Sequence, residues 1–129
     1  MTRQEVLQIC EQGAVNLQVG IVSQAVSDYI VALKTIHNLE EDAEKIRKKI
    51  IKNAMKLKKP KFLTEEEAEQ ERLHMIARQN AILAEVERFF HSEWYRLLCD
   101  IDGDYMLARA RKKYEEWLME QNYNIEKPE

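Results

Sequence analysis

Three aspartates, Asp100, Asp102 and Asp104, alternate around a glycine in the C-terminal third of the chain. Alternating carboxylates are the first ligands of an EF-hand loop, and oxygen-rich clusters of this kind bind Ca²⁺ or Mg²⁺. The rest of that motif is missing, because Tyr105 stands where the loop requires glycine and Arg111 where it requires a bidentate glutamate. We therefore expect no metal site here. The pattern favours a turn between two helices, since aspartate and glycine are typical of helix ends.

A second group of residues could do acid-base or metal chemistry. Glu87 and His91 are four residues apart, so on a helix they share a face. Together with Glu93, Asp100 and Asp102 they could hold a divalent ion for phosphoester hydrolysis. However, the chain has no nucleophile elbow, P-loop, HExxH motif or glycine-rich dinucleotide turn. We predict that the protein is not an enzyme and uses neither a metal nor another cofactor.

The charges are sorted along the chain. Residues 1–44 carry 2 basic and 7 acidic side chains, residues 45–61 carry 9 basic and none acidic, and residues 62–129 carry 9 basic and 16 acidic. The basic run would suit a nucleic-acid backbone or an anionic membrane surface. It has no interleaved aromatics to stack on bases, and acidic neighbours can neutralise it, so we favour a solvated helix face. Under the phosphate-contact alternative, the contacting residues are Lys45, Lys48, Lys49, Lys52, Lys56 and Lys59.

Aromatic residues gather in the segment from Phe89 to Leu107. Trp94 and Tyr95 are adjacent and point about 100° apart on a helix, so we expect one of them to reach the surface. An exposed tryptophan or tyrosine beside aspartates is a suitable anchor for a protein partner. The candidate partner-binding residues are therefore Trp94, Tyr95, Asp100, Asp102, Asp104 and Tyr105.

The elements that position these residues are long helices, because three glycines and two prolines leave few places for turns. Thr2 and Thr64 each begin a capping box, and Asn38 followed by acidic residues is a further start signal. Proline interrupts the pattern within residues 58–63. The predicted helices lie near 3–36, 39–57, 65–101 and 104–121.

Apolar residues recur at three- and four-residue steps along each predicted helix, which places them on one stripe. In the third helix this stripe includes Val86, Phe89 or Phe90, Trp94 and Leu97. The fold class is therefore all-α, a single domain over residues 1–129 built as an antiparallel helical bundle or long helical hairpins. A dimeric coiled coil is an alternative, and both a monomer and a homodimer fit the pattern.

The composition also bears on location. The two cysteines, Cys10 and Cys99, are far apart and have no partner at metal-binding spacing, which suits a reducing cytosol. The N-terminal residues contain acids and no continuous apolar core, so they predict no signal peptide. The longest uncharged stretch falls short of the roughly 20 apolar residues of a membrane span. We expect a soluble cytoplasmic protein without a membrane partner.

The aromatic segment reads FFHSEWYRLLCDIDGDYML, and AVSDYIVAL precedes it at residues 25–33. These segments resemble the FFxSEWxxxLxDIDGxYL and AxxDYxxAL patterns of small uncharacterised proteins encoded by phages and prophages of Gram-positive bacteria, except that Met106 stands between the expected Tyr and Leu. The matching residues are Ala25, Asp28, Tyr29, Ala32, Leu33, Phe89, Phe90, Ser92, Glu93, Trp94, Leu98, Asp100, Ile101, Asp102, Gly103, Tyr105 and Leu107. The resemblance implies a cytoplasmic protein of a bacterial host cell and supplies no catalytic residue.

The resemblance implies a mode of action, because small accessory proteins of this kind often act by occupying a surface of a host enzyme, including defence nucleases such as CRISPR effectors. Our first functional hypothesis is therefore a non-enzymatic, protein-binding accessory protein that inhibits such a host defence (an anti-CRISPR protein). The alternative is a nucleic-acid-binding protein that uses the basic helix at 45–61. A metal-dependent phosphoester hydrolase ranks third.

Overall fold

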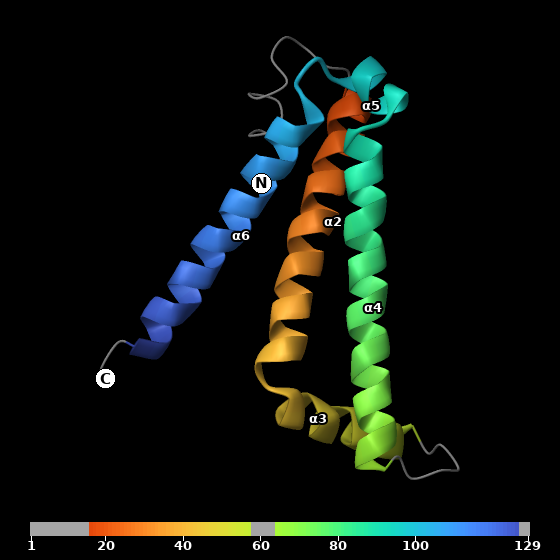
Figure 1. Ribbon diagram of the computed structural model, residues 1–129, viewed down its shortest axis with the longest axis vertical. Coiled ribbons are helices and arrows are strands. Elements are labelled where there is room, and N and C mark those ends of the chain that lie inside the picture. The colour runs from red at the N-terminus through yellow and green to blue at the C-terminus, as the bar shows by residue number, and fades with distance from the viewer. Residues whose placement is uncertain (1–15, 58–63, 127–129) are drawn as a thin grey trace. The chain divides into compact units, whose positions relative to one another are not determined.

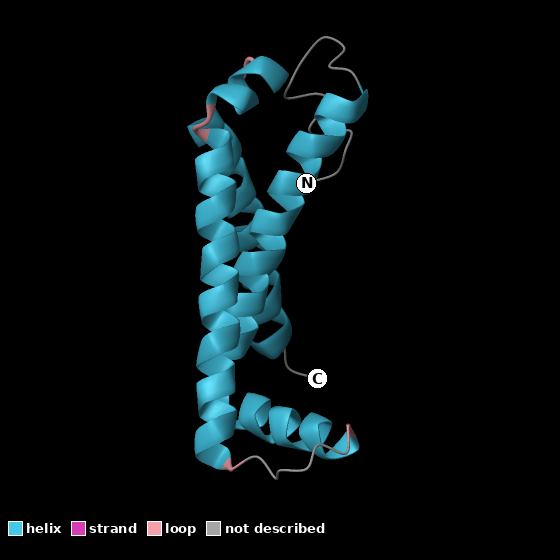
Figure 2. Cartoon of the chain, turned by 90° about the vertical axis from the view of Figure 1, so that its right-hand side faces the viewer, coloured by secondary structure: helices cyan, strands magenta, loops and turns pink. Residues whose placement is uncertain are grey.

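The computed structural model describes residues 16–57 and 64–126. These residues form five α-helices and no β-strand, and α4 runs antiparallel to α2 and to α6 (Figures 1 and 2). The prediction of an all-α antiparallel bundle is confirmed. The capping box at Thr2, the proline break at 58–63, Cys10 and Lys59 lie outside the described residues. The helices are α2 (Asn16–Glu41), α3 (Ala43–Lys56), α4 (Glu65–Phe90), α5 (Glu93–Leu98) and α6 (Gly103–Glu126).

The chain divides into two compact units. The described part of the first unit comprises residues 16–31 and 82–126, and that of the second unit comprises residues 32–57 and 64–81. Helices α2 and α4 each contribute to both units. That residues 1–129 form one domain stays a prediction.

The first unit buries one apolar stripe from each of its long helices. Tyr95 in the short helix α5 and Cys99 at its C-terminal end are buried in the same core. These stripes follow the three- and four-residue steps in the sequence, as expected for helices that face a common core. The buried stripe residues are Val19, Val22, Val26, Tyr29 and Ile30 on α2, Val86 and Phe90 on α4, and Met106, Leu107 and Ala110 on α6.

The second unit buries mainly small side chains: Ala32, Leu39, Ala54 and Ala68. Thr64 begins α4 with the predicted capping box. Its hydroxyl accepts the backbone N–H of Glu67 at 3.1 Å, and the Glu67 carboxylate accepts the backbone N–H of Thr64 at 3.4 Å. Each contact satisfies a backbone donor that the first helical turn leaves without a partner.

The boundary between the first two helices differs from the predicted one. We expected Asn38 to cap the second helix, but α2 continues to Glu41, and Asp42 is the cap. The Asp42 carboxylate accepts the backbone N–H of Lys45 at 3.0 Å, as an N-cap should. Asparagine and aspartate cap about equally well, so local preference alone could not choose between the two positions.

The predicted helix over 65–101 is interrupted at His91 and Ser92. Helix α4 ends at Phe90, and Ser92 caps α5 by accepting the backbone N–H of Tyr95 at 3.1 Å. The Ser92 hydroxyl also donates to the carbonyl of Phe89 at 2.6 Å, which satisfies one acceptor at the end of α4. One serine therefore ends one helix and begins the next.

Gly103 does not play the role that we predicted. The sequence predicted a glycine in a turn between two helices, but Gly103 is the buried first residue of α6. Asp102 precedes it as the cap, with its carboxylate accepting the backbone N–H of Asp104 at 3.2 Å. A Cβ atom at Gly103 would lie 1.9 Å from the carbonyl oxygen of Phe90. Glycine is required here because two backbone segments approach closely.

Candidate functional sites

The break before α5 decides which aromatic residues reach the surface. Trp94 is 55% exposed and Leu97 is 81% exposed, whereas Tyr95 is 1% exposed. A continuous helix would have placed Trp94 and Leu97 on the buried stripe with Phe90. Because α5 begins after the break, its side chains do not continue the stripe of α4. The prediction that Trp94 and Leu97 face the core is therefore wrong. Tyr95 was also predicted to bind a partner, but its side chain is buried in the core.

Trp94 packs against a cluster of aromatic side chains. Its ring lies edge-on to Phe89, with centroids 5.5 Å apart, and Phe89 contacts Tyr95 in the same way at 5.6 Å. Phe90 and Tyr95 complete the cluster at 5.0 Å. Edge-to-face pairs at these distances are favourable, so Trp94 is exposed and yet supported.

The DIDGD turn lies next to α5. Asp100, Asp102 and Asp104 are exposed, and Tyr105 is 49% exposed. The Nε2 atom of His91 lies 2.5 Å from the Oδ1 atom of Asp104, which ties the end of α4 to the start of α6. Within residues 16–57 and 64–126, no three His, Cys, Asp or Glu side chains are grouped so that they could hold a metal ion.

Glu87 does not form the predicted pair with His91 but joins a buried tyrosine. The Tyr29 hydroxyl donates to the Glu87 carboxylate at 3.0 Å and accepts from Arg111 Nε at 3.1 Å. The pKa of Tyr29 is raised, chiefly because burial disfavours the phenolate. The pKa of Arg111 is also raised by its hydrogen bond to Tyr29. The group links α2, α4 and α6, and sequence periodicity gave no sign of it beyond a tyrosine on the buried stripe.

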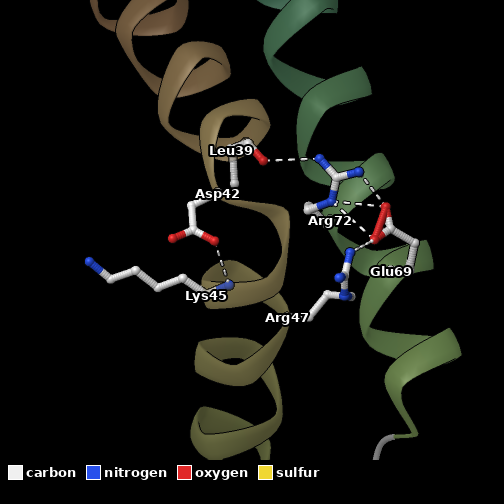
Figure 3. A network of polar contacts seen from close by, with 6 residues as sticks. All are labelled: Leu39, Asp42, Lys45, Arg47, Glu69 and Arg72. Atoms are coloured by element: carbon white, nitrogen blue, oxygen red, sulfur yellow. Dashed lines mark hydrogen bonds and ion pairs between the residues drawn. The ribbon is translucent and has the colours of Figure 1, made fainter. Parts of the chain in front are cut away.

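A second polar network lies in the unit of residues 32–81 (Figure 3). Glu69 on α4 accepts from Arg72 Nε at 2.9 Å and from Arg47 Nη1 on α3 at 2.5 Å. Arg72 also donates to the carbonyl of Leu39 at 3.0 Å, near the end of α2. These hydrogen bonds, first that of Arg72 and then that of Arg47, hold the pKa of Glu69 below its ordinary value. The network therefore joins α4 to the end of α2 and to α3, the two helices that meet at Asp42.

The predicted anion-binding lysines divide into two groups. Lys48 pairs with Glu44 at 3.3 Å, and Lys59 lies outside the described residues. The others are exposed, and none of their ammonium groups forms an ion pair with a described residue. The Lys45 side chain points away from α4, whereas Arg47 points toward Glu69 (Figure 3). The lysines of this second group are Lys45, Lys49, Lys52 and Lys56.

Comparison of the chain with protein-family models, curated proteins and solved structures finds no match. Residues Val19–Glu41 of α2 are long and apolar enough to cross a membrane, a test that the core helix of a soluble protein also passes. One third of its most apolar 18-residue window is buried inside the protein. The cytoplasmic location and the absence of a membrane partner stay predictions.

Proposed function

We propose that this chain is a non-enzymatic protein-binding module whose contact surface is centred on Trp94 and Leu97. The observation that carries the proposal is the exposure of these two large apolar side chains, 55% and 81%, three residues apart on one short helix. Side chains three residues apart are neighbours on a helix surface. Tryptophan is among the residues most enriched at the energetic centres of interfaces.

The surroundings of this pair suggest the chemistry of the partner. Residues 92–104 contain four acidic side chains and one arginine. The acidic residues, Glu93, Asp100, Asp102 and Asp104, are exposed. We expect a protein with an apolar pocket for the tryptophan, bordered by lysine or arginine. Complementary charges at the rim speed association and select the partner more than they add affinity.

The finer version of the proposal follows from the phage resemblance: the partner is a host defence nuclease, such as a CRISPR effector, in the bacterial cytoplasm. A plasmid-interference assay in cells that carry such an effector tests it. The wild-type chain should restore plasmid survival, and the Trp94→Ala/Leu97→Ala variant should not. Survival that is unchanged by the wild-type chain would remove this version and leave protein binding itself to be tested separately.

Binding itself is tested by quantitative capture from a lysate of the bacterium that carries the gene. The matched control is Met119→Ala, which removes another exposed apolar side chain, 71% exposed, from the same unit. A partner recovered in stoichiometric amount should be lost with Trp94→Ala/Leu97→Ala and retained with Met119→Ala. Equal recovery with both variants, or no stoichiometric partner, would overturn the proposal. Circular dichroism checks that both variants remain helical.

A further inference from the structure

The free lysines of α3 form a single row. Lys45, Lys49, Lys52 and Lys56 follow one another at steps of four, three and four residues. At about 100° and 1.5 Å per residue, they fall within about 60° of arc and extend for about 16 Å along the helix. The row is therefore a straight ridge of positive charge.

This ridge lies on the side of α3 opposite its buried residue. Ala54, the buried residue of α3, is nine residues from Lys45 and so lies about 180° around the helix. Ile50, Ala54 and Leu57 line a groove together with His74 and Met75 of α4. The apolar side of α3 is thus turned to α4, and the lysine row is turned to solvent.

Ion pairs with described residues do not neutralise the row. Helix α3 carries six basic residues and one acidic residue, Glu44. The ion pairs of α3 with described residues are those of Arg47 with Glu69 and Lys48 with Glu44, which involve no member of the row. Four ammonium groups on one ridge repel one another, and an external polyanion would relieve that repulsion.

We infer that the lysine row of α3 binds the phosphate backbone of duplex DNA without reading its sequence. One strand of B-form DNA presents a phosphate every 3.4 Å along the axis, and because the strands wind around the duplex, a straight ridge of about 16 Å reaches several phosphates. Helix α3 has no aromatic residue on which unpaired bases could stack, which favours the duplex over a single strand. On its apolar side Ala54 is buried, and Ile50 and Leu57 line the groove beside α4, which leaves less apolar surface for insertion into a membrane.

The test is fluorescence anisotropy of a labelled 20-base-pair duplex titrated with the full chain at several salt concentrations. Four phosphate contacts predict a slope of log K against log salt of about −3.6, so affinity should fall about 150-fold between 50 and 200 mM salt. Lys49→Gln/Lys52→Gln should lower the slope to about −1.8, and replacement of all four lysines should abolish binding.

The matched control is Arg88→Gln/Lys112→Gln, which removes the same charge from exposed positions on α4 and α6. It should leave the slope unchanged. Parallel titrations use a single strand of the same sequence and vesicles containing phosphatidylserine. The inference is overturned by no duplex binding at 50 mM salt, by equal losses in the row and control variants, or by tighter binding to the single strand or the vesicles. It is independent of the proposed protein-binding surface, which none of these variants alters.

Discussion

Tyr29 and Arg111 are 82 residues apart in the chain, and the Nε atom of Arg111 donates to the Tyr29 hydroxyl at 3.1 Å. The guanidinium carbon also lies 5.8 Å from the centre of the tyrosine ring. The same hydroxyl donates to Glu87, so one buried tyrosine oxygen on α2 is hydrogen-bonded to both α4 and α6. A buried hydroxyl with both of its partners in place specifies how three apolar stripes meet, because any other register would leave it unsatisfied.

Removal of that hydroxyl should weaken the first unit measurably. Tyr29→Phe should lower the free energy of unfolding by about 1 kcal/mol, the usual net contribution of an internal hydrogen bond. The loss stays modest because Arg111 and Glu87 also pair directly, at 3.5 Å. Urea unfolding followed by circular dichroism measures it. Tyr105→Phe is the control, since Tyr105 is 49% exposed and should unfold like the wild type; equal losses would contradict the role of Tyr29.

The two described glycines should respond oppositely to alanine. Gly20→Ala should stabilise the protein by about 0.5–1 kcal/mol, because Gly20 is inside α2 and nothing lies within 4 Å of the new Cβ atom. Gly103→Ala should destabilise it by about 1–3 kcal/mol or more, because the Cβ atom would collide with the Phe90 carbonyl. Thermal unfolding of both variants is the measurement. A Gly103→Ala variant as stable as the wild type would disprove the close approach.

The position of the cap between α2 and α3 can be tested with a similar pair. Asp42→Ala should cost about 1 kcal/mol, because the backbone N–H of Lys45 loses its acceptor. Asn38→Ala should change stability by less than about 0.5 kcal/mol in the favourable direction, since an exposed interior helical position prefers alanine. Chemical denaturation distinguishes the two. If Asn38→Ala were the more destabilising change, Asn38 and not Asp42 would be the cap.

Glu69 should make the second unit sensitive to acid. Because Arg72 and Arg47 hold the pKa of Glu69 below its ordinary value, the folded state binds its proton less readily than the unfolded state. The stabilisation is therefore complete above about pH 4.3, the ordinary glutamate value, and is lost as the pH falls through the lower folded-state pKa. Glu69→Gln should lower the Tm at pH 7, and its deficit should shrink at acidic pH. The control Glu71→Gln, which breaks the exposed pair with Arg78, should keep the wild-type acid response. A Glu69→Gln deficit of constant size at every pH would contradict this account.

The regular parts of the fold could be predicted from the sequence. Helical periodicity places Val22, Val26 and Tyr29 on one face of α2, and these residues are buried. The capping box at Thr64 depends only on residues three apart, and the structure confirms it. Such local patterns need no knowledge of neighbouring elements.

The parts that the sequence could not predict depend on contacts between distant residues. The break after Phe90 coincides with the close approach of Gly103, thirteen residues later, which no local preference reveals. Ser92 is a good N-cap residue and is followed by the acidic Glu93, which indicates a helix start. The continuous apolar stripe nevertheless favoured one unbroken helix. Missing this break placed Trp94 and Leu97 on the buried stripe, because a new helix start changes which side chains face the core.

Site-specific photo-crosslinking tests the proposed contact surface most directly. A photoreactive amino acid is placed at Leu97, and in a separate variant at Met119, and each chain is irradiated in cells of the organism that carries the gene. Position 97 should give one discrete crosslinked protein, and position 119 should not give it. If position 97 yields no protein adduct, or if both positions yield the same adducts, the surface around Trp94 and Leu97 does not bind a partner.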